Sequence, residues 1–265
     1  MKSSFNTDRP FQEVLFHSEA SASDIALRIY DHRVSQTVTP LVLYFHGGLF
    51  NCGQIDDADA MASILAREAV VVCVDYPLAP KLHFPATVEL AFEALSWAGK
   101  HATEYEAQAS KLIVAGDQAG GNLAAAVAMM VRDRGLADKA KLIAQILINP
   151  MLDPQQSTLS MQSAEDCPCR KAWADYLPVA SDAMHPYAAP LFSRRLHSLV
   201  SALIITADQD PLRDEAEQYA AKLITSGVPV QIRRLHAAKT SLANPSCVSF
   251  KETAAIVSQF ITDFS

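Results

Sequence analysis

Hydrophobic runs and amphipathic stretches alternate along this chain of 265 residues. The runs are short, rich in Val, Ile and Leu, and hardly interrupted by polar residues, which is typical of strands buried on both faces of a parallel sheet. They predict strands at 39–48, 70–80, 111–116, 142–150, 201–208 and 229–235. Between the runs, apolar residues recur every three or four positions. This spacing predicts helices at 61–69, 87–102, from 122 onward, 214–227 and 251–264.

Two segments depart from this alternation. Residues 24–32 switch between apolar and polar positions, and we expect an antiparallel strand at the edge of the sheet. Residues 153–186 are polar and contain several prolines, with one short helix predicted at 170–178. We interpret 153–186 as a short, cap-like insertion over the C-terminal ends of the strands, the edge at which open α/β sheets bind ligands.

The order of strands and helices predicts the fold class. We expect an α/β fold in a single domain over 1–265, with a mostly parallel central sheet and helices on both faces. A chain of this length can bury one large core. Because the insertion at 153–186 is short, the cap over the sheet is expected to be reduced.

Composition and charge exclude several classes of protein. The formal net charge of −7 and the lack of a long Lys/Arg cluster argue against binding to nucleic acid. No run of 18 apolar residues is present, so we expect no membrane span. The first residues are polar and lack the apolar core of a signal peptide, and we therefore expect a cytoplasmic protein.

Cysteine usage agrees with that compartment. The five cysteines are odd in number and widely spread, which suits a reducing environment better than a disulfide framework. Only Cys167 and Cys169 stand close together, and no second Cys or His pair follows at ligand spacing. We expect neither a metal site nor a cofactor.

The stretch VAGDQAGGNLAAAVAMM, residues 114–130, joins a buried strand to a helix through a tight glycine turn. In a serine hydrolase the centre of such a turn reads G-x-S-x-G, and the serine is the nucleophile. Here the turn reads Gly116-Asp117-Gln118-Ala119-Gly120. Glutamine therefore stands at the position of the nucleophile.

Five stretches, in order, resemble the hormone-sensitive-lipase-like branch of the α/β-hydrolase fold, which comprises carboxylesterases, acetyl esterases and their relatives. The first two are YFHGG (44–48), similar to the H-G-G oxyanion loop, and VDYPLAPKLHFPA (74–86), similar to D-Y-R-L-A-P-E-x-x-F-P-A. GDQAGGNLA (116–124) matches G-D-S-A-G-G-N-L-A in all but the serine. HPYAAPL (185–191) resembles N-P-x-x-S-P-L, and DQDPLRDEAEQYAAKL (208–223) resembles the segment around the catalytic acid.

The resemblance implies a Ser-His-Asp triad, and the chain departs from it at two positions. It places the nucleophile at Gln118, the acid at Asp210 and the histidine at Thr240, within LHAAKTSL. A glutamine amide has no proton that ionises near neutral pH, so it cannot form an acyl-enzyme by this route. His236 lies four residues before Thr240, and we expect it at the end of the last strand.

The residues that correspond to the family's oxyanion hole are retained. Gly47 and Gly48 can present backbone N–H groups, and Ala119 follows the elbow at the N-terminus of a helix. These donors predict a binding site for an oxyanion, a carbonyl or a carboxylate. We count His46, a residue of the same loop, with Gly47, Gly48 and Ala119 as ligand-binding. We expect Asp117 to point away from the pocket.

Three functions fit these observations. The first is a catalytically degenerate pseudo-esterase that binds a small carbonyl or carboxylate ligand as a sensor, regulator or binding protein. The second is an enzyme of the same fold with lyase-like or other general acid/base chemistry. The third is a weak carboxylesterase with a displaced base and nucleophile, for which Thr240 and Ser241 supply hydroxyl groups.

The expected partners follow from the same resemblance. The ligand is a small molecule, and neither nucleic acid nor a membrane is expected. Family members often pair through the last strand and helix, so a homodimer is one expected assembly, and a protein partner docking on the cap is another.

Overall fold

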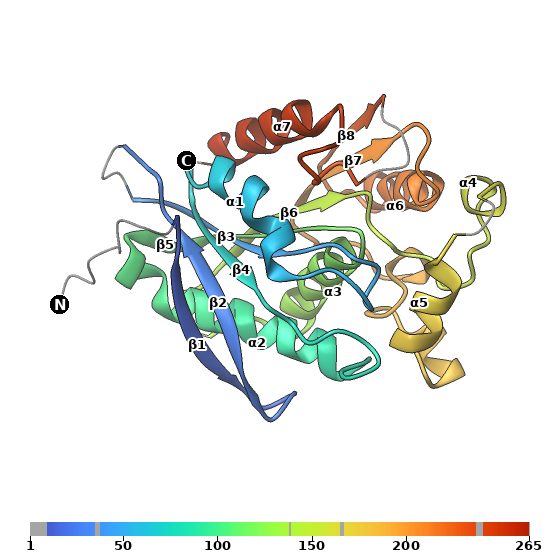
Figure 1. The fold of residues 1–265 in the computed structure, drawn as a ribbon, viewed down its shortest axis with the longest axis horizontal. Coiled ribbons are helices and arrows are strands. Elements are labelled where there is room, and N and C mark those ends of the chain that lie inside the picture. Colours follow the sequence, from blue (N-terminus) through green and yellow to red (C-terminus); the bar gives the residue numbers. More distant parts are fainter. Residues whose placement is uncertain (1–9, 35–37, 138, 165–166, 237–240, 265) are drawn as a thin grey trace.

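One eight-stranded sheet lies at the centre of the molecule, with helices on both faces (Figure 1). The computed structural model describes residues 10–34, 38–137, 139–164, 167–236 and 241–264. The strand order is β1-β2-β4-β3-β5-β6-β7-β8. In chain order the strands are Gln12–Ser18 (β1), Ser23–Tyr30 (β2), Thr39–Phe45 (β3), Val70–Val74 (β4), Ala107–Asp117 (β5), Leu142–Ile148 (β6), Ser201–Ala207 (β7) and Val230–Leu235 (β8).

The sheet is parallel over most of its width. β3 pairs in parallel with β4 and β5, and β5, β6, β7 and β8 continue in parallel. At the other end, β2 pairs antiparallel with β4, and β1 pairs antiparallel with β2. This arrangement confirms the predicted fold class.

Residues 24–32 contain the antiparallel strand β2, but the expectation that this strand lies at the edge is wrong. β1 covers it, with Gln12 opposite Ile29 and Ser18 opposite Ser23. β1 buries only part of its length: Phe16 is buried, whereas Leu15 is 64% exposed. Because Leu15 is exposed while the polar Ser18 is buried, apolar and polar residues do not alternate along β1, and the sequence pattern missed it for this reason.

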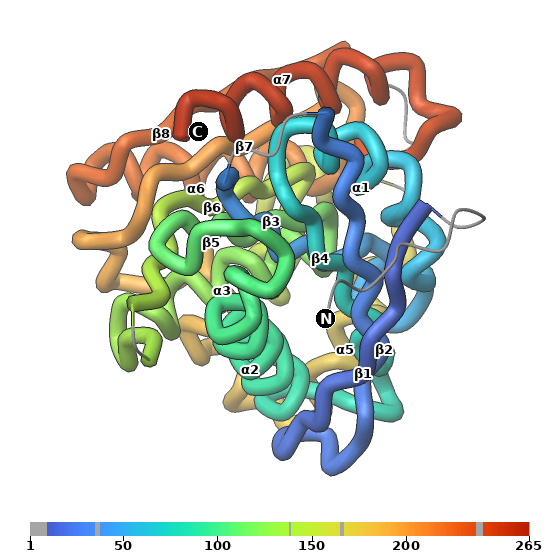
Figure 2. Tube along the Cα trace, turned by 90° about the vertical axis from the view of Figure 1, so that its left-hand side faces the viewer, coloured from blue at the N-terminus to red at the C-terminus, as the bar shows by residue number. Residues whose placement is uncertain are grey.

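Helices cover both faces of the sheet (Figures 1 and 2). Three pack on one face: α2 (Ala86–His101), α3 (Ala119–Arg134) and α6 (Arg213–Thr225). Two pack on the other: α1 (Asp59–Leu65) and α7 (Phe250–Thr262). The chain also forms the short helices α4 (Leu159–Gln162) and α5 (Cys169–Tyr176), and 3-10 turns at Ile55–Ala58, Ala102–Tyr105, Ala180–Met184 and Pro190–Phe192. Within the part of the chain that the structure describes, no helix combines the length and apolarity needed to cross a membrane.

The apolar runs are continuous because the central strands bury both faces. In β3, Leu41, Leu43 and Phe45 belong to the core under α2 and α3. Val42 and Tyr44 belong to the core under α1 and α7. A polar side chain on either face of β3 would lose its hydration without gaining a partner. The run therefore contains almost no polar residues.

The cap-like insertion lies at the end of the molecule toward which the β6 and β7 arrows point (Figure 1). Its helix α5 packs on the turn that follows β3. The ring of Tyr176 stacks on Phe50, with centroids 3.8 Å apart and an interplanar angle of 3°. The side-chain amide of Asn51 donates a hydrogen bond to Asp175 at 2.8 Å. The cap thus contacts the glycine turn directly.

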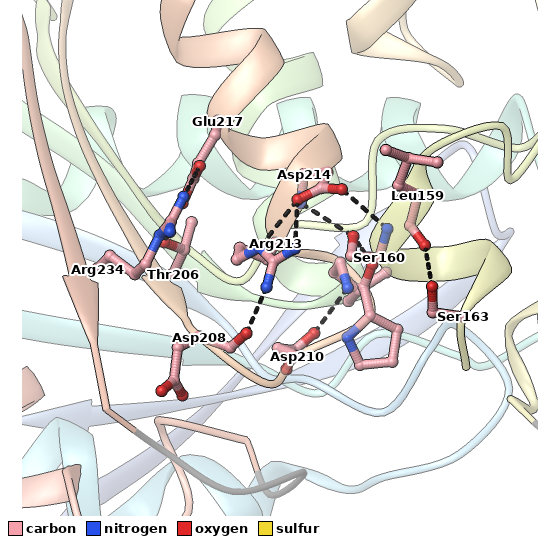
Figure 3. Close-up of polar contacts among 12 residues, drawn as sticks. Leu159, Ser160, Ser163, Thr206, Asp208, Asp210, Arg213, Asp214, Glu217 and Arg234 are labelled. Carbon is pink, nitrogen blue, oxygen red and sulfur yellow. Dashed lines mark hydrogen bonds and ion pairs between the residues drawn. The ribbon is translucent and has the colours of Figure 1, made fainter. Parts of the chain in front are cut away.

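The other cap helix, α4, is tied to the start of α6 (Figure 3). The Ser160 N–H donates to the Asp214 carboxylate at 2.8 Å, and the Ser160 hydroxyl donates to the Pro211 carbonyl at 2.7 Å. Arg213 also pairs with Asp214 and donates to the carbonyl of Asp208. These bonds hold the loop that carries Asp210.

Glycines allow α3 to begin directly against the end of β3. A Cβ added at Gly120 would overlap the carbonyl oxygen of Phe45 and lie 2.6 Å from the carbonyl oxygen of His46. A Cβ at Gly116 would overlap the backbone of Gly120. The glycines of this turn are therefore required by packing, whether or not the turn carries out catalysis.

Replacing Gly120 with alanine should destabilise the fold strongly, although alanine is the better helix former. Because the overlap is with backbone atoms that cannot rotate away, we expect a loss of at least about 3 kcal/mol in the free energy of unfolding. Gly227→Ala is the matched control, since a Cβ there meets nothing within 4 Å and adds only the strain of φ +79°, about 1 kcal/mol. Urea denaturation measures both, and equal losses would contradict the packing argument.

Candidate functional site

Gln118 occupies the turn between β5 and α3. Its backbone has φ 49° and ψ −112°, a conformation that non-glycine residues rarely adopt and that resembles a nucleophile elbow. The Gln118 N–H donates to the Ile148 carbonyl at 2.9 Å. The Gln118 carbonyl accepts from the N–H groups of Met151 at 3.0 Å and Asn122 at 3.1 Å. Residue 118 therefore lies at a strained turn between strand and helix and carries an amide.

The side chain of Gln118 reaches the predicted oxyanion loop. Its Oε1 accepts a hydrogen bond from the Gly48 N–H at 3.1 Å. Gly48 has φ +114°, and a Cβ there would overlap the carbonyl of Cys52. The glycine conformation thus aims one backbone donor at residue 118, and the amide oxygen of Gln118 takes the place of a carbonyl oxygen at this donor.

His46 lies beneath the loop rather than in it. The ring is 2% exposed and stacks on Tyr76, with centroids 4.4 Å apart. Its Nδ1 lies 2.7 Å from the carbonyl oxygen of Gly47, and the Tyr76 hydroxyl donates to the His46 carbonyl at 2.8 Å. Burial lowers the pKa of His46. These contacts make His46 a neutral support for the loop.

The first turn of α3 is anchored by Asn122. Its buried side-chain amide donates to the carbonyls of Met151 at 2.8 Å and Ala188 at 2.9 Å. Ala119, the first residue of α3, is fully buried, so its side chain belongs to the core. The start of α3 is thereby held against the segments that follow β6 and precede β7.

Asp117 faces the pocket, and the expectation that it points away is wrong. Asp117 Oδ1 accepts from the Tyr44 hydroxyl at 3.1 Å, and Oδ2 accepts from the Ser241 hydroxyl at 3.1 Å. A Cβ added at Gly47 would overlap Asp117 Oδ2, so this oxygen lies against the oxyanion loop. Burial raises the pKa of Asp117 to about 6.

The alternation of β5 carried the signal that the sequence reasoning missed. Ile113 and Ala115 face the core under α1 and α7, so Asp117 at the same parity points to that side. Tyr44 has the same parity in the neighbouring strand β3, whose partner for Tyr44 is Ala115. The Tyr44–Asp117 contact follows from strand register alone.

A cavity of about 290 Å³ opens beside these groups. Its size suits a small organic ligand. It is lined by Gly47, Gly48, Gly53, Asp57, Asp117, Gln118, Ser241, Ala243, Asn244 and Pro245. The structure thus brings together three of the predicted site residues, Gly47, Gly48 and Gln118. The described residues that line the cavity do not include His46, Ala119 or Asp210, and Thr240 lies outside the described residues.

Asp210 is buried and is not among the described residues that line this cavity. Its Oδ2 accepts from the side-chain amide of Asn149 at 2.7 Å, and its Oδ1 accepts from the Leu212 N–H at 2.8 Å. Asp210 is 5% exposed, and burial raises its pKa to about 6. The Asn149 Oδ1 is buried and has no hydrogen-bond partner among the described residues. The carboxyl group in the acid position is therefore held by an amide.

His236 follows the end of β8, as predicted. Its Nδ1 lies 2.6 Å from Asp208 Oδ2, and its side chain is 85% exposed. This pair lies on the surface, and neither residue is among the lining residues of the cavity beside Gln118. His236 is thus engaged away from the elbow.

The remaining candidate chemistry lies in the cap. Cys167 and Cys169 are free thiols with their sulfur atoms 2.8 Å apart. Among the described residues, no group of three or more His, Cys, Asp or Glu side chains is placed to hold a metal ion.

Asp210 makes the stability of the protein depend on pH. Because its pKa is raised to about 6, the folded state keeps a proton that the unfolded state releases between about pH 4 and pH 6. The free energy of unfolding should therefore fall as pH rises through this window, by about 3 kcal/mol from Asp210 alone. Asp210→Asn, which is neutral throughout, should remove that part of the fall, and its amide can donate to the unpartnered Asn149 Oδ1.

Urea denaturation at about pH 4 and about pH 7 tests this expectation. The control is Asp263→Asn, which changes an exposed carboxyl group and should leave the pH dependence of the wild type in place. An Asp210→Asn variant that loses as much stability as the wild type between these two pH values would contradict the assignment.

Comparisons with known proteins agree with this architecture. The model of the α/β-hydrolase fold family matches residues 42–240. An arylesterase of Saccharolobus solfataricus is 35% identical over 215 residues, which cover 78% of this chain and 69% of that protein. Carboxylesterase NlhH of Mycobacterium tuberculosis is 35% identical over 223 residues, which cover 79% of this chain and 68% of that protein.

Solved structures extend the match to nearly the whole chain. The structure of an arylesterase superposes with a TM-score of 0.86 at 31% identity, over 96% of this chain and 84% of that chain. A hyperthermophilic esterase from the archaeon Pyrobaculum calidifontis superposes with a TM-score of 0.85 at 33% identity, over 96% of this chain and 85% of that chain. The protein whose elbow carries Gln118 thus belongs to the hormone-sensitive-lipase-like carboxylesterase family of the α/β-hydrolase fold.

Proposed function

We propose that this protein binds a small, uncharged carbonyl compound, such as an ester or an amide, in the cavity beside Gln118. The observation that carries the proposal is the hydrogen bond from the Gly48 N–H to Gln118 Oε1 at 3.1 Å. A carboxamide of the protein itself already uses the donor that an oxyanion hole offers to a carbonyl oxygen. A ligand with the same group can take its place when the Gln118 side chain rotates away.

The charges around the cavity favour a carbonyl ligand over a carboxylate. Asp57 and Asp117 line the cavity, and the described lining residues include no Lys, Arg or His. A pKa of about 6 leaves Asp117 mostly ionised at neutral pH. A bound carboxylate would therefore face like charge without a cation to offset it.

The proposal includes loss of the family's hydrolytic route at residue 118. Glutamine offers no nucleophile, and the sequence has Thr240 in the place of the histidine. His46 and His236 are engaged elsewhere, with Gly47 and Asp208. A sensor, a regulator or a binding protein would use such a site.

A second candidate function is carboxylester hydrolysis by a different set of groups. The names of the relatives favour it, since an arylesterase and a carboxylesterase match about four fifths of the chain. Under this function the Gly48 N–H donates to the oxyanion of the reacting ester. The nucleophile is then a side chain elsewhere in the cavity.

Binding of acetanilide, an unreactive amide analogue of an aryl ester, tests the proposed function. We expect weak binding by the wild type, about millimolar, and about threefold to tenfold tighter binding by Gln118→Ala, because the ligand then competes with no internal amide for Gly48. Phenylacetate, the matched anion, should bind more weakly to both proteins. Ligand-observed NMR titration measures all four affinities. Preference for phenylacetate, or no effect of the substitution, would overturn the proposal.

Hydrolysis of 4-nitrophenyl acetate by Gln118→Ser and Gln118→Ala tests the loss of the elbow route. Both variants free the Gly48 N–H, and they differ only by one hydroxyl group at the elbow. We expect equal turnover within about threefold, because the sequence has no histidine at position 240 and the neighbouring carboxylate, Asp117, accepts from Tyr44 and Ser241. A rate more than about tenfold higher in Gln118→Ser would mean that a general base still serves residue 118.

A further inference from the structure

Ser241 places a hydroxyl group in the same cavity, opposite the elbow. Ser241 lies 124 positions along the chain from Asp117, the last residue of β5. Only the fold brings these two residues together. Its Oγ donates to Asp117 Oδ2 at 3.1 Å, and its side chain lines the cavity with Gly47, Gly48 and Gln118. Ser241 stands directly after Thr240, where the resemblance placed the catalytic histidine.

The carboxylate beside Ser241 is oriented from behind. The Tyr44 hydroxyl holds Asp117 Oδ1 at 3.1 Å, which leaves Oδ2 for the serine. Tyr44 is 1% exposed and belongs to the core, so packing holds its side chain in place. A hydroxyl group bonded to a base, with the base bonded to a third group that orients it, is the arrangement by which enzymes activate a nucleophile.

An oxyanion donor lies within the same cavity. Asp117 Oδ2 lies against Gly47, and the next residue, Gly48, presents its N–H to the cavity. A carbonyl bound at Gly48 would therefore share one cavity with the Ser241–Asp117 pair. Hydroxyl, base and oxyanion donor come from three separate parts of the chain.

We propose that Ser241 is an acyl-accepting nucleophile, with Asp117 as its proton acceptor and Tyr44 as a positioning residue, and that its substrates are aryl esters of short carboxylic acids. The proposal rests on the proposed function, because the ester carbonyl must be held at Gly48. It gives the second candidate function a nucleophile that is independent of the elbow.

The step conserves atoms and charge. Ser241 Oγ attacks the carbonyl carbon while its proton passes to Asp117 Oδ2, and the carbonyl oxygen becomes an oxyanion that accepts from the Gly48 N–H. The oxyanion then collapses, the bond from carbon to the aryl oxygen breaks, and an aryloxide leaves. The products are acyl-Ser241 and the aryloxide, which needs no proton in order to leave. Asp117 returns its proton to solvent.

The base suits this task near neutral pH. Burial raises the pKa of Asp117 to about 6, which makes it a stronger proton acceptor than an ordinary aspartate while it stays ionised at about pH 8. The described residues that line the cavity include no histidine to activate water, so the acyl group should leave slowly. We therefore expect a stoichiometric burst and a stable adduct rather than fast turnover.

Acetylation by 4-nitrophenyl acetate at about pH 8 tests the proposal. The wild type should release one 4-nitrophenolate per chain in a burst, gain the mass of one acetyl group, and carry it on Ser241 by peptide mapping. Ser241→Ala should lose the burst. Ser246→Ala is the matched control, because it removes a hydroxyl five residues away that is exposed and does not line the cavity.

Asp117→Asn should slow the burst by about 100-fold, the usual contribution of a general base, while thermal unfolding reports whether the fold is kept. Ser241→Cys guards against a fold defect in Ser241→Ala, since its adduct should become a thioester at the same residue. An acetyl group on lysines alone, with an unchanged burst in Ser241→Ala, would overturn the proposal.

Tyr44→Phe tests positioning through the pH profile of the burst. The titratable groups that act on Asp117 are Tyr44 from β3, Tyr76 after β4 and Asp57 from the turn before α1. The Tyr44 hydrogen bond lowers the pKa of Asp117, so its removal should move the midpoint of the burst rate to higher pH. A lower rate with an unmoved midpoint would overturn the role of Tyr44.

Acetanilide separates the two proposals. Binding of acetanilide without an adduct on Ser241 would overturn the inference and leave the proposed function standing. An adduct on Ser241 that acetanilide does not slow would support the nucleophile and overturn the carbonyl site at Gly48. An adduct that acetanilide slows would support both.

Discussion

The close approach of α3 to the end of β3 is the constraint on which the site depends. The first turn of the helix can reach the Phe45 carbonyl only because residue 120 is glycine. That approach sets the distance between the elbow and the glycine turn after β3, and so allows the side chain of Gln118 to reach the Gly48 N–H. The positive φ of Gln118 is maintained by the same packing, since its backbone bonds to the ends of β6 and to α3. A change of side chain at position 118 removes the hydrogen bond to Gly48 but leaves the packing of Gly120 against Phe45 in place.

Scaffold and chemistry are separable in this chain. The glycines of the turn and Asn122 are held by packing and hydrogen bonds that do not depend on the side chain at position 118. The groups that would carry out hydrolysis are single side chains at the surface of that scaffold. Identity of about 35% with the relatives therefore identifies the family and the fold, whereas the reaction depends on a few positions in and around one cavity.

Much of the fold could be predicted from the sequence because its strands are buried on both faces. Val70–Val74 is an unbroken apolar run, Leu142–Ile148 is interrupted only by the buried Gln145, and both form interior strands of the sheet. β1 escaped notice because its apolar and polar residues do not alternate: Leu15 faces solvent and Ser18 is buried. The site was harder to predict. The positions of Gly47, Gly48 and Gln118 follow from local motifs, but the contacts of Asp117 with Ser241 and of Asp210 with Asn149 join residues far apart in sequence. Strand parity could have oriented Asp117, whereas nothing local indicates that an amide would bond to Asp210.

The hydrogen bond between Gln118 and Gly48 has a further consequence for any ligand of this cavity. Because the competing amide is part of the same chain, it is present at a high effective concentration that does not change with dilution of the protein. A ligand that uses the Gly48 donor must exceed that effective concentration, scaled by its own affinity, before it occupies the site. Any compound that uses the Gly48 donor would therefore bind with an apparent dissociation constant raised by the internal amide, by the same factor at every protein concentration.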